Sequence, residues 1–125
     1  MGDNLLIHLT YITLWAQKYE ACLAFYRDQL GLPLEAADHN FAQFTTQGAR
    51  LYLHRLDEAE PLRPDTVEIH FTVADVDEVY SALVERGVRF EQAPADMPWG
   101  RRMAACRDPE GYSVEIVGPL QGHAG

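Results

Sequence analysis

Apolar residues recur along this chain either at every second position or at every third or fourth position. Stretches with these two spacings follow one another in the same order twice. Alternating apolar residues rich in β-branched and aromatic types predict strands, whereas apolar residues three or four apart predict a helix. In the first half we expect a strand over 5–15, a helix over 19–30, and strands over 33–37, 41–46 and 50–54. In the second half we expect a strand over 66–73, a helix over 76–86, and strands over 89–92, 102–107 and 112–117. The order strand, helix and three strands therefore occurs twice.

Local signals support these boundaries. Gly31 and Gly87 follow the two helices, as expected of C-terminal stops. Asp75 can cap the second helix, with Glu78 in the capping-box position. The segment 108–111 reads Asp-Pro-Glu-Gly, which predicts a type I turn. The expected buried stripes are Tyr19, Leu23, Tyr26 and Leu30 on the first helix, and Val76, Val79, Tyr80 and Leu83 on the second.

Composition narrows the possible functions. The 125 residues are 47% apolar and 23% charged, which is typical of one folded domain. A formal charge of −9 with 10 Lys and Arg argues against nucleic-acid binding. No apolar run approaches the roughly 20 residues of a membrane helix. The two cysteines, Cys22 and Cys106, are far apart, and no export signal is evident, so we expect reduced thiols in a cytoplasmic protein.

Four predicted strands share one unusual face. Because alternate residues of a strand point to opposite sides, one side of each is apolar and suits packing under a helix. The opposite sides carry Tyr11, Thr13 and Trp15; Arg50, Tyr52 and His54; Glu68, His70 and Thr72; and Ser113, Glu115 and Val117. This face could simply meet water, as antiparallel sheets allow. Its aromatic content instead favours a ligand cavity, since such cavities are lined by aromatic side chains with a few polar groups.

Several stretches resemble the glyoxalase, bleomycin-resistance and extradiol-dioxygenase superfamily, also called vicinal oxygen chelate proteins. They are the segments 9–14, 24–32 (AFYRDQLGL), 71–77, 99–102 (WGRR) and 108–112 (DPEGY). The resemblance implies an α+β fold of two βαβββ modules that form a curved mixed sheet around a cavity, in a homodimer. We expect a single domain over 1–125, with module one at about 5–56, a connector at 57–65 and module two at about 66–118.

The resemblance also implies where a metal would lie. Metal-dependent members tend to hold an ion at positions that fall here on Tyr11, Tyr52, Glu68 and Glu115, where His, Gln and Glu would be typical. Two tyrosines replace such ligands in the first half. We therefore expect no resident metal or other cofactor. The alternative is a divalent metal held by Glu68 and Glu115, with His70 nearby.

The candidate catalytic residues are Glu68, Glu115 and His70. Two close carboxylates beside an imidazole could exchange protons near neutral pH, or could be hydrogen-bonding partners within a binding pocket. The candidate ligand-binding residues are Tyr11, Thr13, Trp15, Arg50, Tyr52, His54, Trp99 and Arg101. Trp99 could be a lid or a loop anchor. Arg50 and Arg101 could bind an anionic or oxygen-rich ligand, or pair with surface carboxylates.

Three hypotheses follow for function. The first is a metal-free protein that binds a small molecule, of the bleomycin-resistance type. The second is a lyase, isomerase or dioxygenase of the same superfamily that uses Glu68, Glu115 and His70, with or without a divalent metal. The third is a regulatory or structural dimer with a vestigial cavity. Neither nucleic acid nor a membrane is an expected partner.

Overall fold

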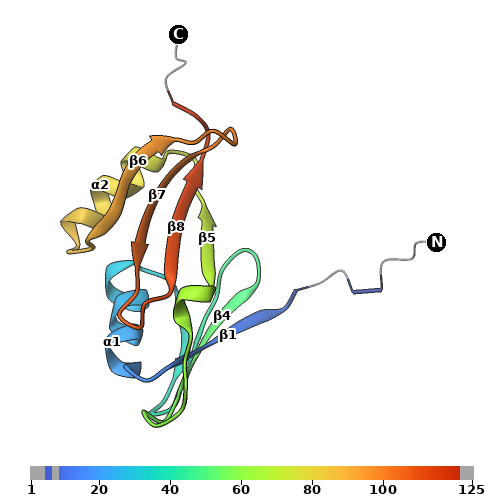
Figure 1. Ribbon diagram of the computed structural model, residues 1–125. Coiled ribbons are helices and arrows are strands. Elements are labelled where there is room, and N and C mark those ends of the chain that lie inside the picture. Colours follow the sequence, from blue (N-terminus) through green and yellow to red (C-terminus); the bar gives the residue numbers. More distant parts are fainter. Residues whose placement is uncertain (1–4, 7–8, 122–125) are drawn as a thin grey trace. The chain divides into compact units, whose positions relative to one another are not determined.

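The computed structural model describes residues 5–6 and 9–121, and the chain divides into two compact units, Met1–Glu60 and Pro61–Gly125 (Figure 1). The boundary falls inside the stretch expected to be a connector. Each unit carries its helix and four strands in the predicted βαβββ order, which confirms the α+β class. Each unit forms its own open, four-stranded mixed sheet. None of the described helices has the length and hydropathy needed to cross a membrane.

The first unit is built around a parallel pair of strands. Its elements are β1 (Tyr11–Ala16), α1 (Tyr19–Ala24), the π-helical turn η1 (Phe25–Gln29), β2 (Leu34–Ala37), β3 (Phe41–Phe44) and β4 (Arg50–Arg55). The strand order is β1-β4-β3-β2, with β1 parallel to β4 and the other pairs antiparallel. Helix α1 packs against β4. Leu14, Leu51 and Leu53 point into the core, as their alternation predicts.

The first strand is shorter than expected. The prediction began it at residue 5, but β1 begins at Tyr11, and residues 7–8 lie outside the described part of the chain. A strand needs a hydrogen-bonding neighbour, and Tyr11 lies opposite Arg50, the first residue of β4. The exposed Ile12 also departs from the expected apolar packing face. Strand length was therefore set by the partner strand and not by the apolar run.

The first helix ends in a wider turn than the sequence predicts. The amide of Leu30 donates to the carbonyl oxygen of Phe25 at 2.9 Å, an i to i−5 bond, and Gly31 follows at φ 75°. A π turn adds a residue to the helical repeat, so side chains after it, such as Leu30, shift around the helix axis. The buried residues are Tyr19, Cys22, Phe25 and Tyr26, whereas the predicted Leu23 and Leu30 are half-buried.

The second unit repeats this plan. Its elements are η2 (Pro64–Thr66), β5 (Glu68–Thr72), α2 (Val76–Glu85), β6 (Phe90–Asp96), β7 (Arg102–Arg107) and β8 (Ser113–Gly118). The strand order is β5-β8-β7-β6, with β5 parallel to β8. Helix α2 packs against β6, β7 and β8 (Figure 1). The side chain of Asp75 accepts the amide of Glu78 at 3.1 Å, which confirms the predicted cap.

Strand β6 extends to Asp96, beyond the predicted end at residue 92, although it contains Pro94. The strand lies at an edge of its sheet and its pairing with β7 shifts register twice. Proline is tolerated at edges and bulges because no neighbour there needs its missing N–H. The sequence shows the proline but not the edge position.

The predicted turn at 108–111 anchors the start of β8. The amide of Gly111 donates to the carbonyl oxygen of Asp108 at 3.0 Å. The carboxylate of Asp108 is buried and accepts the amides of Glu110, Gly111 and Tyr112, each at 2.9 Å. Cys22 and Cys106 are both buried free thiols.

Candidate functional site

Two parallel strands of the second unit bring four polar side chains onto one face. In the register of β5 with β8, Glu68 lies opposite Ser113 and His70 lies opposite Glu115. Residues two apart on a strand share a face, and paired residues of neighbouring strands lie side by side. Glu68, His70, Ser113 and Glu115 therefore form a two-by-two array, which we call the Glu–His cluster.

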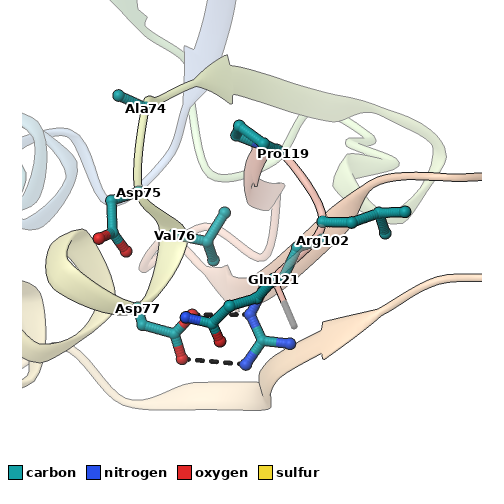
Figure 2. Close-up of a pocket in the computed structure, with 8 residues that line it drawn as sticks. Ala74, Asp75, Val76, Asp77, Arg102, Pro119 and Gln121 are labelled. Carbon is teal, nitrogen blue, oxygen red and sulfur yellow. Dashed lines mark hydrogen bonds and ion pairs between the residues drawn. The ribbon is translucent and has the colours of Figure 1, made fainter. Parts of the chain in front are cut away.

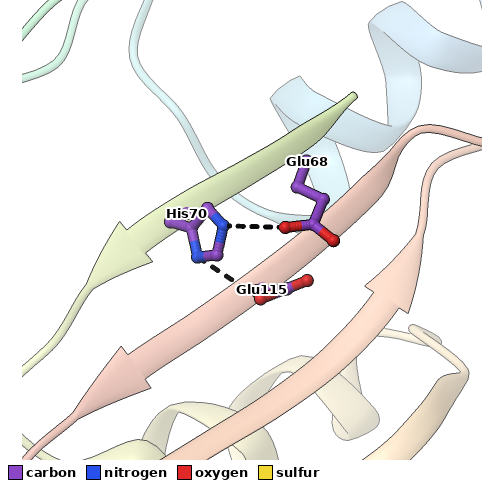
Figure 3. Close-up of side chains that lie close together, drawn as sticks. All are labelled: Glu68, His70 and Glu115. Atoms are coloured by element: carbon purple, nitrogen blue, oxygen red, sulfur yellow. Dashed lines mark hydrogen bonds and ion pairs between the residues drawn. The ribbon is translucent and has the colours of Figure 1, made fainter. Parts of the chain in front are cut away.

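The imidazole of His70 lies between the two carboxylates (Figure 3). Its Nε2 is 3.3 Å from Oε1 of Glu68, and its Nδ1 is 3.3 Å from Oε1 of Glu115. The other carboxylate oxygen of Glu115 accepts the hydroxyl of Ser113 at 3.3 Å. Glu115 lies on β8 between two neighbouring strands and is 8% exposed, whereas Glu68 lies on the edge strand and is exposed.

The role of each ring nitrogen in these contacts depends on which of them carries hydrogen. A neutral imidazole carries one N–H, so its second nitrogen would present a lone pair to a carboxylate. Both contacts are hydrogen bonds when both nitrogens carry hydrogen, as in imidazolium.

The Glu–His cluster has a different set of donors from the metal sites that are most common in proteins. One ligand atom from each of Glu68, His70 and Glu115 lies within 4.8 Å of the others, so spacing alone would allow an ion. The ring nitrogens, however, each face a carboxylate oxygen directly. Hard cations take six or more oxygens, and the usual facial triad has two histidines with one carboxylate. The donor set here matches neither.

The first unit presents an aromatic face. Tyr11 of β1 stacks on Tyr52 of β4 with ring centroids 4.3 Å apart and planes at 18°. Further along the same two strands, the ring of Trp15 lies against the ring of His54, with centroids 4.3 Å apart and planes at 35°. Phe41 of β3 contacts both Tyr52 and His54 edge-on, at 5.2 and 5.8 Å. Five rings thus contact one another on one side of the sheet, and we call them the aromatic face.

This face is open to a large degree. Tyr11 is 51% exposed and Trp15 43% exposed, while Phe41, Tyr52 and His54 are half-buried. Thr13 is half-buried and lies opposite Tyr52 in the register. Exposed aromatic rings of this kind can stack against the ring of a ligand.

The remaining predicted ligand-binding residues are Arg50, which lies opposite Tyr11 beside the aromatic face, and Trp99 and Arg101 in the second unit. Arg50 pairs with Glu35 at 3.2 Å, the surface pairing that the sequence left open. Trp99 lies in the turn between β6 and β7 and is 55% exposed. The same turn is closed by the amide of Met97, which donates to the carbonyl oxygen of Arg101 at 2.7 Å.

Ser113 and Phe41 are additions that the sequence did not single out. Strand alternation does place Ser113 on the face of Glu115, but its contact with that carboxylate depends on side-chain geometry. Phe41 begins a short strand whose neighbour is β4, and only this pairing brings it against Tyr52 and His54.

A separate polar hollow of about 180 Å³ lies at the start of α2 (Figure 2). Arg102 of β7 donates to the two carboxylate oxygens of Asp77 at 2.6 and 3.0 Å, and to Asp96 at 3.2 Å. The guanidinium hydrogen bonds hold the pKa of Asp77 below its usual range. Because two carboxylates already bind this guanidinium, we interpret the ion pairs beside the hollow as structural contacts that hold α2 to β7.

Two βαβββ units, one with an aromatic face and one with carboxylates at the expected positions, define a protein of the vicinal oxygen chelate class. The chain belongs to the Glyoxalase/Bleomycin resistance protein/Dioxygenase superfamily, whose family model matches residues 8–116. It is 30% identical over 122 residues to the uncharacterised protein YraH of Bacillus subtilis (strain 168), covering 86% of this chain and 95% of YraH.

Solved structures agree with this assignment. A glyoxalase/bleomycin resistance protein/dioxygenase from Nocardioides is 27% identical, with a TM-score of 0.81, covering 96% of this chain and 88% of its own. TnmS3, an antibiotic binding protein from Streptomyces sp. CB03234, is 25% identical, with a TM-score of 0.75, covering 94% and 100%.

Proposed function

We propose that this protein binds a planar aromatic small molecule on the aromatic face and needs no resident metal to do so. The observation that carries the proposal is the set of five contacting rings on β1, β3 and β4, of which Tyr11 and Trp15 are the most exposed. TnmS3, a similar protein, is an antibiotic binding protein, which supports the binding of a small molecule here.

Physical chemistry favours stacking as the mode of binding. An aromatic pair contributes about 0.5–1.5 kcal/mol beyond its buried area, so each lost ring weakens binding by roughly 2- to 10-fold. Tyr11 and Tyr52 are already nearly parallel, and a flat ligand can lie against this preformed surface with little reorganisation. The formal charge of −9 favours neutral or cationic ligands over anions.

Calorimetric titration with bleomycin and with proflavine tests the proposal. Both Trp15→Leu and Tyr52→Leu should weaken saturable binding. The matched control is Tyr80→Leu, because Tyr80 belongs to a different ring pair, 4.7 Å from Phe90, in the second unit. Unchanged affinity in both aromatic-face variants, or no saturable binding across a wider panel of planar compounds, would contradict the proposal.

Fluorescence adds a direct readout of contact. Trp15 and Trp99 are the two tryptophans of the chain, so Trp99→Phe leaves Trp15 as the reporter. Ligand stacked on the aromatic face should quench this emission in parallel with the calorimetric isotherm.

A second candidate is a metal-independent lyase or isomerase. The observation that favours it is the contact of buried Glu115 with His70, a carboxylate and imidazole placed to hold and release a proton. Glu115→Gln should then abolish turnover while leaving ligand affinity unchanged. Dioxygenase chemistry has less support, because the facial triad of non-haem iron oxygenases has two histidines and one carboxylate, whereas this cluster has one histidine and two carboxylates.

We also propose that the protein is a homodimer in the cytoplasm. The family resemblance supports a homodimer, with a mass in solution of about twice the 14.1 kDa chain. Light scattering after size-exclusion chromatography tests this. Two buried free thiols are consistent with a cytoplasmic protein.

A further inference from the structure

We infer that Gln43 of β3 selects the ligand of the aromatic face by hydrogen bonding, and that this ligand is a neutral planar compound with an amide or lactam edge. The inference rests on the proposed function, which it deepens by naming the chemistry of the ligand. The observation behind it is a carboxamide on the aromatic face that has no hydrogen-bonding partner within residues 5–6 and 9–121.

Strand register places Gln43 on the aromatic face. On β3, Gln43 lies opposite Tyr52 of β4. Phe41, two residues earlier on β3, contacts the rings of Tyr52 and His54. Residues two apart on a strand share a face, so Gln43 projects on the same side of the sheet as these rings. Strand β3 lies between β4 and β2, so Gln43 stands within this face and not at the edge of the sheet.

The carboxamide is accessible to a ligand. On the side away from Tyr52, Gln43 lies opposite Ala36 of β2, whose methyl group is too short to cover it. The residue as a whole is half-buried, yet no buried side-chain nitrogen or oxygen of the described residues lacks a partner. Because the Gln43 amide has no partner, its Oε1 and Nε2 are open to solvent on the face where the rings lie.

Other polar side chains of the first unit already have partners. The amide nitrogen of Gln17 lies 2.6–3.3 Å from three backbone carbonyl oxygens of the segment 57–60. The guanidinium of Arg50 pairs with Glu35 at 3.2 Å. These groups are committed to the fold, whereas the Gln43 side chain makes no such contact in the described part of the chain. Its hydrogen-bonding capacity therefore remains available for a ligand.

A carboxamide is complementary to one kind of ligand edge. Its oxygen accepts and its nitrogen donates, so a lactam, with N–H and C=O side by side, can form two hydrogen bonds with it at once. A planar ligand without these groups would cover the amide and leave it unpaired, which lowers the affinity. The amide is neutral, so it selects hydrogen-bonding groups and not charge. The aromatic face should therefore prefer a ring system with a lactam over the same ring system without one.

Equilibrium dialysis of the full chain against two matched compounds tests the inference. Phenanthridinone and phenanthridine both have three fused rings, but only phenanthridinone has a lactam. The wild type should bind phenanthridinone about threefold more tightly or better, since one neutral hydrogen bond changes an affinity by about 2- to 10-fold. Gln43→Leu keeps the bulk of the side chain but removes the amide, and should make the two affinities equal. The matched control is Gln47→Leu, in the exposed turn between β3 and β4, which should keep the preference.

Two results would overturn the inference and leave the proposed function standing, provided that Trp15→Leu weakens the binding of both compounds. One is equal affinity of the wild type for the two compounds, and the other is a preference that survives Gln43→Leu. Phenanthridine bound equally by the wild type and Gln43→Leu shows that the variant is folded. Loss of both compounds in Gln43→Leu and in Gln43→Ala would make Gln43 a structural residue and would also overturn the inference. If neither compound binds the wild type, the proposed function fails together with the inference.

Discussion

Gly118→Ala should destabilise the second unit because the new methyl group has no space. Gly118 ends β8, and a Cβ there would lie 2.7 Å from the carbonyl oxygen of Val73 and 3.0 Å from Cγ2 of Val76. The first contact is with backbone that cannot move alone, since the amide of Val73 donates to the carbonyl oxygen of Val117 at 2.9 Å. Overpacking of this kind costs about 1–3 kcal/mol.

Urea denaturation followed by circular dichroism measures this loss. Gly48→Ala is the matched control, because its Cβ would meet only Oγ1 of Thr46, at 3.9 Å, and Gly48 does not adopt a positive φ. The control should leave stability within about 1 kcal/mol of the wild type, or raise it, since alanine restricts the unfolded chain. Equal midpoints and slopes for Gly118→Ala and Gly48→Ala would refute the steric argument.

Two further predictions concern pH. Burial, with Asp108 nearby, raises the pKa of the Cys106 thiol to about 11, so stability should fall as pH rises from about 9 to 11, by on the order of 2–3 kcal/mol. Cys106→Ala should flatten this part of the stability profile. Because Arg102 lowers the pKa of Asp77, their pairing stabilises the fold above the ordinary carboxyl pKa and is lost as pH falls through the lowered value. The Tm difference between wild type and Arg102→Met should therefore be largest near neutral pH and shrink in acid; a constant difference would contradict this.

The sequence by itself determined the order of elements and their local ends. The Asp75 cap and the turn that begins at Asp108 depend on side chains bonding to amides two to four residues away. Such contacts form within one stretch of chain, so residue type and spacing are enough to predict them. Alternation along β5 likewise placed Glu68 and His70 on one face, because a strand repeats every two residues.

Tertiary structure decided what these residues contact. Strands β5 and β8 are far apart in sequence, and their parallel register alone set His70 opposite Glu115 and Glu68 opposite Ser113. A shift of one residue would have reversed the face that Glu115 presents. The start of β1, the edge position of Pro94 and the stacking of Tyr11 on Tyr52 depend in the same way on partner strands. The pairing of distant strands depends on packing of the whole unit, so no local pattern in the sequence predicts it.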